Sequence, residues 1–510
     1  MKPLRLVLAA ALFCATALHA QTLDLIIHNG SLIDGSGSPA IHADIGITGD
    51  RIVFIGSSKG RTAKRTIDAT GLIVTPGFID PHTHTAADLT DPKRAHNAPY
   101  LMQGVTTVAT GNDGDSPEHI GATLTKWTQQ GIGTNAVLFI GQGTVRHEVL
   151  QMSDAAPTPA QLEQMKSLVD TAMNEGAIGL STGLYYAPGS YATTEEVIAL
   201  AKVAAVHGGI YDTHMRDEST YNIGLLGAVK ETLRIGKEAN IPVMISHIKA
   251  LGIDVWGQST DVIQLIDDAR KQGIRATASE YPYDASGTSV TASLIPRWAE
   301  ADGKLLQNID DPALHDRLVK EMTENLRRRG GPASLLMTSA KDKTIVGKNL
   351  AQIAQERNVS PIDAALQIVR AGGSDVASFN MKESDIENFM RQPWVMTCSD
   401  GSTGHPRKYG TFPRKIHDYV FDKHVITLEA AVRSSTSLTA ETLGLKGRGL
   451  LQPGYFADVL VFDPKTYNAR ATYEDPTQLA TGVRYLTVNG QLSIDNGNLT
   501  TTLAGRALRH

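Results

Sequence analysis

Residues 75–88 read TPGFIDPHTHTAAD, in which the apolar pair Phe78-Ile79 leads into Asp80-Pro81-His82-Thr83-His84. Side chains two residues apart on an extended strand point to the same face. His82 and His84 would therefore present two imidazoles side by side where a strand ends. Two neutral imidazoles in this arrangement can bind one Zn²⁺ at Zn–N distances of roughly 2.0–2.1 Å. An isolated H-x-H is also common as two surface histidines, so the remaining sequence has to distinguish the two interpretations.

The length and composition of the chain limit the classes of protein to be considered. With 510 residues, of which 47 are glycine and 20% are charged, the chain predicts a large α/β domain together with a smaller one. The net charge is −5, whereas proteins that bind nucleic acid or an anionic membrane surface usually carry an excess of positive charge. We therefore expect a small-molecule partner and no nucleic acid. The oligomeric state is left open.

The first 20 residues predict a signal peptide. Lys2 and Arg5 precede an apolar run, residues 6–18, that is too short to span a bilayer as a helix. Small residues allow cleavage after Ala17 or after Ala20, and we favour the second site. We therefore expect a periplasmic or secreted protein with no membrane attachment after cleavage. Cleavage would leave Cys398 as the single cysteine, which excludes an intramolecular disulfide.

Both ends of the mature chain predict short β-strands joined by tight turns. The expected N-terminal strands are 23–27, 45–47 and 52–55, and the expected C-terminal ones are 457–462, 483–488 and 491–494. Asn-Gly and Gly-Asp pairs between alternating apolar runs are hairpin signals. The simplest arrangement is one small β domain, made from residues 21–70 and 446–510, with the large domain inserted between its two halves.

The middle of the chain, residues 71–445, alternates strands with capped helices. Four consecutive helix-then-strand units, between about residues 158 and 281, imply a parallel sheet with right-handed crossovers. Eight strands in a unit of this length predict a TIM-type (β/α)8 barrel, whereas an open doubly wound sheet is the alternative. The interval after the seventh strand is too long for one connection, so we expect an inserted subdomain at about 285–347, followed by further barrel helices. The eight expected strands are 73–84, 105–113, 136–141, 177–182, 210–214, 243–247, 274–281 and 394–400.

Residues that can bind a metal lie at the carboxyl ends of these strands, where the working residues of such barrels are found. Nitrogen donors combined with carboxylates are typical of a transition-metal site, because Ca²⁺ and Mg²⁺ prefer oxygen ligands only. Taken singly, a histidine could satisfy hydrogen bonds in the core, and Asp113 or Asp400 could stabilise its own turn. The candidate ligands are His82, His84, Asp113, His214, His247 and Asp400.

Seven segments in this order make the chain resemble the amidohydrolase superfamily, and within it the D-aminoacylases, which are N-acyl-D-amino-acid deacylases. The resemblance covers essentially the whole mature chain. It implies His82, His84, His214 and His247 as zinc ligands, Asp400 as ligand and catalytic base, and a β domain made from both chain ends. The seven segments are TPGFIDPHTH, QGVTTVATGNDG, GAIGLSTGLYYAPGSYATTEE, GGIYDTHMRDE, ISHIKALG, YPYDAS and SDGSTGHPRKYGTFPR.

The same resemblance implies an activity and a substrate-binding set. Members of the family cleave the amide bond of N-acyl-D-amino acids to a carboxylic acid and a free D-amino acid. Four residues match family positions that bind the carboxylate of the amino acid: Lys249, Tyr281, Ser286 and Arg407. Lys249 and Arg407 would repel each other unless an anion lay between them, and a substrate carboxylate meets that need.

Three positions depart from the family pattern. The fourth strand has no lysine that could bridge two metals, Asp113 occupies the place of a cysteine, and Gln142 occupies the place of a histidine. A carboxylate can bind or bridge metals, so we expect Asp113 to be a ligand and leave open whether one or two zinc ions bind.

Two other functions remain open at this point. Export favours a D-aminoacyl or isopeptide dipeptidase, or another hydrolase of cyclic or linear amides from the same superfamily. A periplasmic metal-binding or ligand-binding protein without activity is the non-enzymatic alternative, against which the complete histidine set and Asp400 argue. The acyl group and the amino-acid side chain that the protein prefers cannot be read from the sequence.

Overall fold

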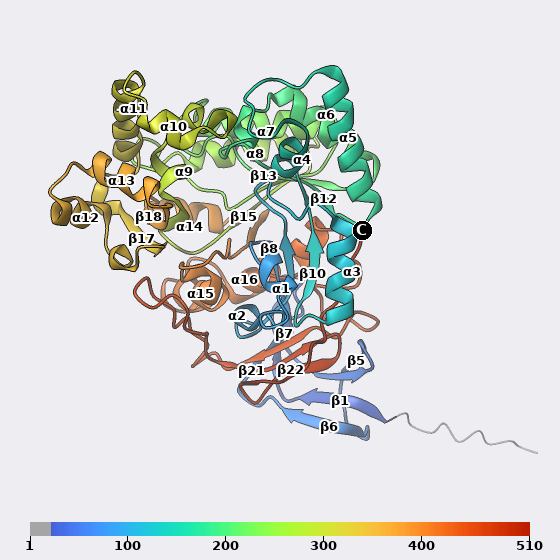
Figure 1. The fold of residues 1–510 in the computed structure, drawn as a ribbon. Coiled ribbons are helices and arrows are strands. Elements are labelled where there is room, and N and C mark those ends of the chain that lie inside the picture. The colour runs from blue at the N-terminus through green and yellow to red at the C-terminus, as the bar shows by residue number, and fades with distance from the viewer. Residues whose placement is uncertain (1–21) are drawn as a thin grey trace, which may run out of the picture.

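The computed structural model describes residues 22–510, and the expected signal peptide lies outside this range. Figure 1 shows a small β domain at the bottom, a barrel surrounded by helices above it, and a further group of helices and strands on the left. Within the described residues, no helix combines the length and the apolar character that crossing a bilayer requires.

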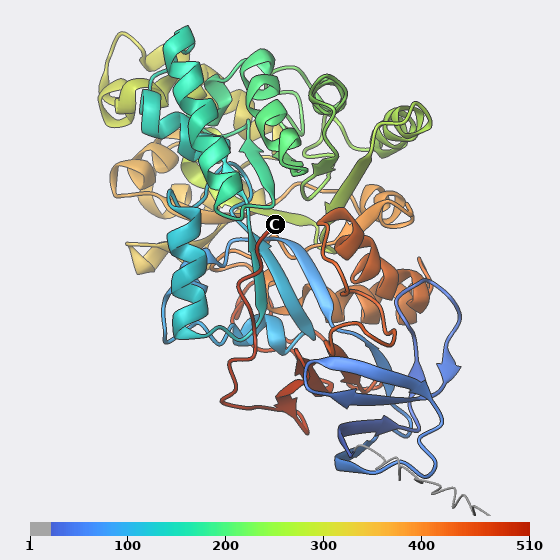
Figure 2. The ribbon, with the colours of Figure 1, turned by 90° about the vertical axis from the view of Figure 1, so that its right-hand side faces the viewer.

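The small domain consists of two sheets. The first is made by N-terminal residues alone, in the order β5-β4-β1-β6. The second has the order β23-β22-β21-β20-β7-β2-β3, so that it combines both ends of the chain; Figure 2 shows the blue and red strands together. The domain predicted from the two chain ends is confirmed. Its strands are β1 (Leu23–His28), β2 (Ser31–Leu32), β3 (Ile41–His42), β4 (Asp44–Thr48), β5 (Arg51–Gly56), β6 (Ala63–Asp68), β7 (Ile73–Pro76), β20 (Val459–Phe462), β21 (Val483–Val488), β22 (Gln491–Asp495) and β23 (Asn498–Leu499).

The large domain is the predicted TIM-type barrel. Parallel pairing runs from β8 through β9 to β10, and from β11 through β12, β13, β14 and β15 to β19. The segments β10 and β11 together make the third strand, and the barrel closes where the backbone N–H of Asp400 donates to the carbonyl of His82 at 3.0 Å. The barrel strands are β8 (Phe78–Thr83), β9 (Val105–Thr110), β10 (Asn135–Leu138), β11 (Ile140–Gly141), β12 (Gly179–Gly183), β13 (Ile210–His214), β14 (Val243–Ile245), β15 (Ala276–Glu280) and β19 (Val395–Thr397).

Helices cover the outside of the barrel. The start of α5 shows why they begin where they do: Thr158 and Gln161 form a capping box, and Pro159 occupies the first helical position. The helices are α1 (Ala86–Thr90), α2 (Ala98–Leu101), α3 (Ile120–Gln130), α4 (Gln142–Leu150), α5 (Pro159–Asn174), α6 (Thr194–Val206), α7 (Leu225–Ala239), α8 (Ser259–Lys271), α14 (Glu383–Met390), α15 (Arg407–Arg414), a π-helical segment (Lys415–Asp422), α16 (Leu428–Ser434) and α17 (Ser437–Thr442).

The first barrel strand differs from the expectation, which placed residues 73–84 in one strand of the large domain. The chain divides at Gly77, because β7 pairs with β20 in the β domain whereas β8 pairs with β9 in the barrel. A Cβ atom on Gly77 would lie 2.2 Å from the side chain of Thr106, so only glycine allows this close approach. The boundary between the domains therefore lies at Gly77, and not at residue 71.

The inserted unit extends past the boundary at about 347 that the sequence suggested. Its antiparallel sheet has the order β16-β18-β17, and β18 ends only at residue 379. The helices α12 and α13, expected around the barrel, instead pack with α9 and α11 in a separate hydrophobic core. An amphipathic pattern predicts a helix but not the core against which the helix packs. The elements are β16 (Ala285–Ser289), α9 (Val290–Leu294), α10 (Leu305–Asp310), α11 (His315–Arg328), β17 (Leu335–Ala340), α12 (Leu350–Arg357), α13 (Pro361–Arg370) and β18 (Ser374–Phe379).

The last residues of the chain leave the β domain and run along the barrel. Gly505 forms an antiparallel bridge with Ile132, and Ala507 forms a parallel bridge with Ala136 at the third strand. The expectation that residues 446–510 all belong to the β domain is thus corrected for these final residues.

Candidate metal and hydrolytic site

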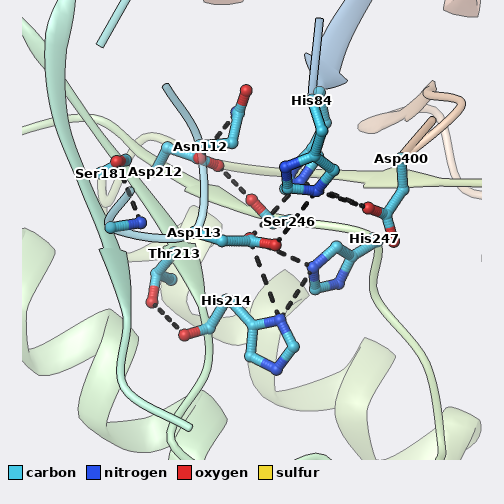
Figure 3. A network of polar contacts seen from close by, with 12 residues as sticks. His84, Asn112, Asp113, Ser181, Asp212, Thr213, His214, Ser246, His247 and Asp400 are labelled. Carbon is cyan, nitrogen blue, oxygen red and sulfur yellow. Dashed lines mark hydrogen bonds and ion pairs between the residues drawn. The ribbon is translucent and has the colours of Figure 1, made fainter. Parts of the chain in front are cut away.

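The six candidate ligands meet at the carboxyl end of the barrel. They fall into two groups whose ligand atoms all lie within 4.8 Å of one another, and Asp113 belongs to both groups. The first group contains His82, His84, Asp113 and Asp400, and the second contains Asp113, His214 and His247. Figure 3 shows His84, His214 and His247 around the carboxylate of Asp113, with Asp400 in contact with His84.

The distances place Asp113 between the two groups. Its Oδ1 lies 3.4 Å from His82 Nε2 and 3.3 Å from His247 Nε2, and its Oδ2 lies 3.5 Å from His84 Nε2. Asp400 Oδ1 lies 3.1 Å from His84 Nε2. One carboxylate thus has an oxygen in reach of ligand atoms from both groups, which is the arrangement of a bridging ligand.

The backbone turns sharply at three of these residues. Asp113, His247 and Asp400 have φ values of 56°, 35° and 48°, in the left-handed region that non-glycine residues seldom occupy. Residues in such conformations persist where the surrounding structure holds them, and they cluster at functional sites. Buried Asp80 provides part of that support for the last strand, because both of its carboxylate oxygens accept from the backbone N–H of Ser399, next to Asp400.

Unsatisfied polar atoms in the cluster fit a bound metal ion. His82 is buried, and neither of its ring nitrogens has a hydrogen-bond partner among the described residues. Asp113 Oδ1 is likewise buried without a hydrogen-bond partner there. Buried polar groups are otherwise nearly always paired. Four imidazoles with two carboxylates are a donor set suited to zinc or a related transition metal.

The charges in the cluster keep both carboxylates ionised. Burial alone would raise the pKa of Asp400, but the charges of Arg407 and His247 outweigh it and hold the pKa well below its usual range. The pKa of Asp113 is lowered in the same way, with burial opposed by His82 and His247. Burial lowers the pKa of His214 to about 4, so this imidazole is neutral at neutral pH, as a metal ligand must be. Burial and Lys249 oppose protonation of His247 as well, but the charges of Asp400 and Asp113 raise its pKa to about 10, so a metal ion bound there would have to displace this proton.

Glu218 is a member of the cluster that the sequence interpretation missed. Its Oε1 lies 3.2 Å from His247 Nδ1 and 2.7 Å from Lys249 Nζ. Lys249 Nζ lies closer still to His247 Nδ1, at 2.8 Å, so an ammonium and a carboxylate together contact this nitrogen. Such partners on the far nitrogen of a histidine fix the ring orientation and the nitrogen that faces a metal. The place of Glu218 four residues after His214, in the segment THMRDE, was the available signal.

One cavity of about 730 Å³ is lined by candidate metal ligands and by the four expected substrate-binding residues, which are Lys249, Tyr281, Ser286 and Arg407. One expectation about them is corrected. Lys249 and Arg407 are not unpaired cations, because Lys249 is paired with Glu218 and Arg407 Nη1 lies 2.8 Å from Asp400 Oδ2. Each cation therefore already has an acidic neighbour, for which the sequence held no local signal.

Comparison with known proteins assigns the family. The model of a family described as "Amidohydrolase family" matches residues 65–494, which is most of the chain. The chain belongs to the amidohydrolase family.

Several relatives are similar to this amidohydrolase over nearly their whole length. D-aminoacylase of Alcaligenes xylosoxydans xylosoxydans is 35% identical, over 96% of this chain and 98% of the relative. N-acyl-D-glutamate deacylase of the same organism is 32% identical, over 92% and 93%.

Solved structures agree. A crystal structure of D-aminoacylase is matched with a TM-score of 0.83 and 33% identity, over 96% of this chain and 100% of that one. N-acyl-D-glutamate deacylase of Bordetella bronchiseptica, complexed with zinc and a phosphonate inhibitor, is matched with the same TM-score and 31% identity, over 96% and 100%.

The inserted unit and the β12–α6 and β13–α7 connections add residues to the cavity that the sequence interpretation did not assign. The ring of Tyr185 stacks on His214, with centroids 5.6 Å apart, and its hydroxyl donates to the carbonyl of Ala292 at 2.7 Å. Tyr221 and Arg329 also line the cavity of this amidohydrolase. None of these residues stands in a local pattern that would have revealed it.

Gln142 and Cys398 lie outside the group of candidate metal ligands. Gln142 donates to Glu196 Oε1 at 3.1 Å, beside the buried pair of Arg146 and Glu196, and it does not line the cavity. Cys398 is buried, and burial raises the pKa of its thiol, so it has the character of a small apolar residue, as the sequence interpretation held.

Proposed function

We propose that this amidohydrolase is a zinc-dependent deacylase that cleaves N-acyl-D-amino acids to a carboxylic acid and a free D-amino acid. One observation carries the proposal: two groups of metal-ligand side chains share Asp113 and include Asp400, in a cavity that also contains Lys249 and Arg407. The names of relatives that are 30–35% identical over nearly the whole chain support the substrate class.

The proposed metal ligands are His82, His84, Asp113 and Asp400 for one position, and Asp113, His214 and His247 for the other. Zinc bound there would supply a Lewis acid for the amide carbonyl and lower the pKa of bound water to about 7. Glu218 would hold His247 in the orientation and protonation state that ligation requires.

Asp400 is the proposed proton carrier. It is ionised at neutral pH, because Arg407 and the neighbouring histidines stabilise its charge, so it can accept a proton from the attacking water. It would then deliver that proton to the departing nitrogen, since an amide anion cannot leave unaided. The expected substrate-binding residues would hold the carboxylate of the amino acid and so fix the α-carbon, which allows only one enantiomer to direct its carbonyl toward the metal.

Hydrolysis of matched substrates tests the proposal. Purified enzyme loaded with zinc should hydrolyse N-acetyl-D-amino acids, while the L-enantiomers and the N-acetyl amines that lack the carboxylate should react poorly. Metal per chain is measured on the same preparation, so that inactivity through metal loss is recognised. Equal rates on the two enantiomers, or on amides without a carboxylate, would remove the substrate class from the proposal.

We further propose export to the periplasm or beyond the cell, with cleavage after Ala20 or after Ala17. The support is the cationic and apolar pattern of the first 20 residues. Intact-mass measurement of the protein recovered from the periplasmic fraction should give a chain that begins at Gln21 or at Leu18. Recovery of the full-length chain from the cytoplasm alone would contradict this.

A further inference from the structure

One cation in the cavity has no acidic partner among residues 22–510. Three lysine or arginine side chains line the cavity: Lys249, Arg329 and Arg407. Lys249 is paired with Glu218 and Arg407 with Asp400. Arg329 is only 2% exposed, and no described carboxylate lies within the 4.0 Å that marks an ion pair with its guanidinium.

The contacts of Arg329 are all with neutral groups. Its Nη1 donates to Ser378 Oγ and its Nη2 to the hydroxyl of Tyr185, each at 3.2 Å. In the amide orientation that satisfies both polar atoms of Asn380, the oxygen of that side chain also accepts from Nη1 at 3.2 Å. The Nε of Arg329 is buried with no hydrogen-bond partner among the described residues.

A buried guanidinium without a counter-charge is costly, since buried charges are normally paired or bound to a ligand. Arginine is also the side chain best suited to bind a carboxylate, through parallel N–H···O bonds. Arg329 lines the cavity, and its charge, which has no carboxylate partner among the described residues, therefore favours an anionic group on the bound substrate.

The position of Arg329 indicates which part of the substrate carries this group. Tyr185 separates Arg329 from the metal cluster, because its ring stacks on His214 and its hydroxyl meets Arg329. Arg407, by contrast, lies directly beside Asp400. An anion at Arg329 is therefore further from the reacting carbonyl than an anion at Arg407.

Hydrogen bonds connect Arg329 to the side of the cavity that holds the amino acid in the proposed function. In the same amide orientation, the side-chain oxygen of Asn380 that accepts from Arg329 Nη1 also accepts from Ser378 Oγ and from Ser286 Oγ, each at 3.0 Å. Ser286 is one of the residues proposed to hold the α-carboxylate. Arg329 is thus a cationic group of the cavity that hydrogen bonds connect to the residues proposed to hold the α-carboxylate.

We infer that Arg329 binds a carboxylate on the side chain of the substrate, so that this enzyme prefers N-acyl derivatives of the acidic D-amino acids, D-glutamate or D-aspartate. This inference rests on the proposed deacylase function and narrows its substrate class.

Selectivity between D-glutamate and D-glutamine substrates tests the inference, because the two differ in side-chain charge and hardly in size. Wild-type enzyme should hydrolyse N-acetyl-D-glutamate with a kcat/KM at least about tenfold above that of N-acetyl-D-glutamine. Arg329→Met should reduce this ratio by about tenfold or more, to near one, because the variant lacks the charge that distinguishes the two side chains. Arg329→Lys, which keeps the charge but loses the paired N–H groups, should retain part of the preference.

Arg328→Met is the matched control. Arg328 is the preceding residue, lies near Glu324 at 3.5 Å and does not line the cavity, so its variant should keep the wild-type ratio. N-acetyl-D-leucine serves as a third substrate.

The outcomes separate this inference from the proposed function. If the wild type hydrolyses N-acetyl-D-leucine but does not distinguish the glutamate from the glutamine substrate, the inference is wrong and the deacylase function stands. If Arg329→Met lowers kcat/KM for all three substrates by the same factor, Arg329 binds the α-carboxylate and the inference is again wrong. If none of the three is hydrolysed, the proposed function fails and the inference fails with it. The wild-type ratio decides the question even if the Arg329 variants do not fold.

Discussion

At the scale of single residues, Asp113 is the feature that most distinguishes this metal cluster. It belongs to both ligand groups, and its two oxygens are directed to different histidines. A carboxylate with two oxygens can bind two metal ions at once, and oxygen is a harder ligand than the thiolate of a cysteine. The aspartate that stands in the place of the family's cysteine is therefore compatible with a two-metal centre.

Asp113→Ala should weaken both metal positions together, because one side chain serves both. Removing even a group that only supports a ligand typically costs 10–100-fold in metal affinity, so we expect a loss of at least about tenfold. Metal per chain is measured by elemental analysis after dialysis at a fixed free-zinc concentration. Asp115→Ala, which removes an acid from the cavity wall outside both groups, should retain the wild-type content. An unchanged metal content in Asp113→Ala would show that Asp113 is not a ligand and only stabilises its turn.

Asp400→Asn should abolish proton transfer while keeping the shape of the side chain. The amide cannot accept the proton of water, so kcat should fall by on the order of 10²–10⁴. Because Asp400 is also a proposed ligand, turnover is compared at saturating zinc and equal metal content. Near-normal turnover in the metal-replete variant would remove Asp400 from proton transfer.

At the scale of elements, the carboxyl ends of the barrel strands bring together residues that are far apart in the sequence. His84 and Asp400 are separated by 316 positions, yet their side chains are 3.1 Å apart because β8 is adjacent to β19. The segments that surround these strand ends also contribute buried polar groups that take no direct part in the cluster. Lys415, at the start of the π-helical segment, is one of them: its Nζ donates to Thr397 Oγ1 at 2.8 Å and to Ser434 Oγ at 3.1 Å.

The buried ammonium of Lys415 should give stability a characteristic pH dependence. Burial lowers its pKa in the folded protein to about 8, although the charge of Glu280 opposes this, whereas the pKa in the unfolded chain is near 10.5. Between these values the unfolded chain binds the proton and the folded protein does not, so stability rises with pH. Across this window the wild type should gain on the order of 3 kcal/mol relative to Lys415→Met.

Urea unfolding of the wild type and of Lys415→Met across this pH range gives the difference between their free energies of unfolding. Groups that titrate in both proteins cancel in this difference. Below about pH 8 the difference between the two unfolding free energies should be flat, since both states then bind the proton. Parallel pH profiles from pH 8 to about 10.5 would show that Lys415 keeps its ordinary pKa in the folded protein.

At the scale of the whole molecule, a buried polar network joins the β domain to the barrel. Asp458, just before β20, pairs with buried Arg448, and its Oδ1 accepts from the backbone N–H of Asn489 at 2.7 Å. Asn489 Nδ2 in turn donates to the side-chain oxygen of Asn135 on barrel strand β10 at 2.8 Å. Because this network crosses the boundary, we expect the two domains to unfold in one transition.

Asp458→Ala should be strongly destabilising, by about 3–5 kcal/mol, because it leaves the charge of Arg448 buried and unpaired. The denaturation midpoint at unchanged slope measures the effect. Asp495→Ala is the control, since it breaks the solvent-exposed pair with Arg65 and should cost only about 0.2–1 kcal/mol. Equal losses in the two variants would mean that burial of the Arg448 pair is not what stabilises the junction.

The sequence by itself determined the barrel, the shared β domain and the set of candidate ligands. These follow from local signals: strand and helix periodicity, capping residues such as Thr158, and polar residues directly after apolar strands, as in DPHTH. In a parallel barrel the strand ends all meet at one face, so knowing where each strand ends is enough to bring His82, His214, His247 and Asp400 together.

Only the tertiary structure decided the partners of these residues. Asp113 lies between both ligand groups, Glu218 pairs with Lys249, and Arg329 has no carboxylate partner in the described part of the chain. All three facts depend on how segments tens to hundreds of residues apart pack together. The same holds for α12 and α13, whose apolar faces fit the inserted core as well as they would have fitted the barrel. Local patterns indicate that a side chain will be buried, whereas the identity of its neighbours depends on how the complete chain packs.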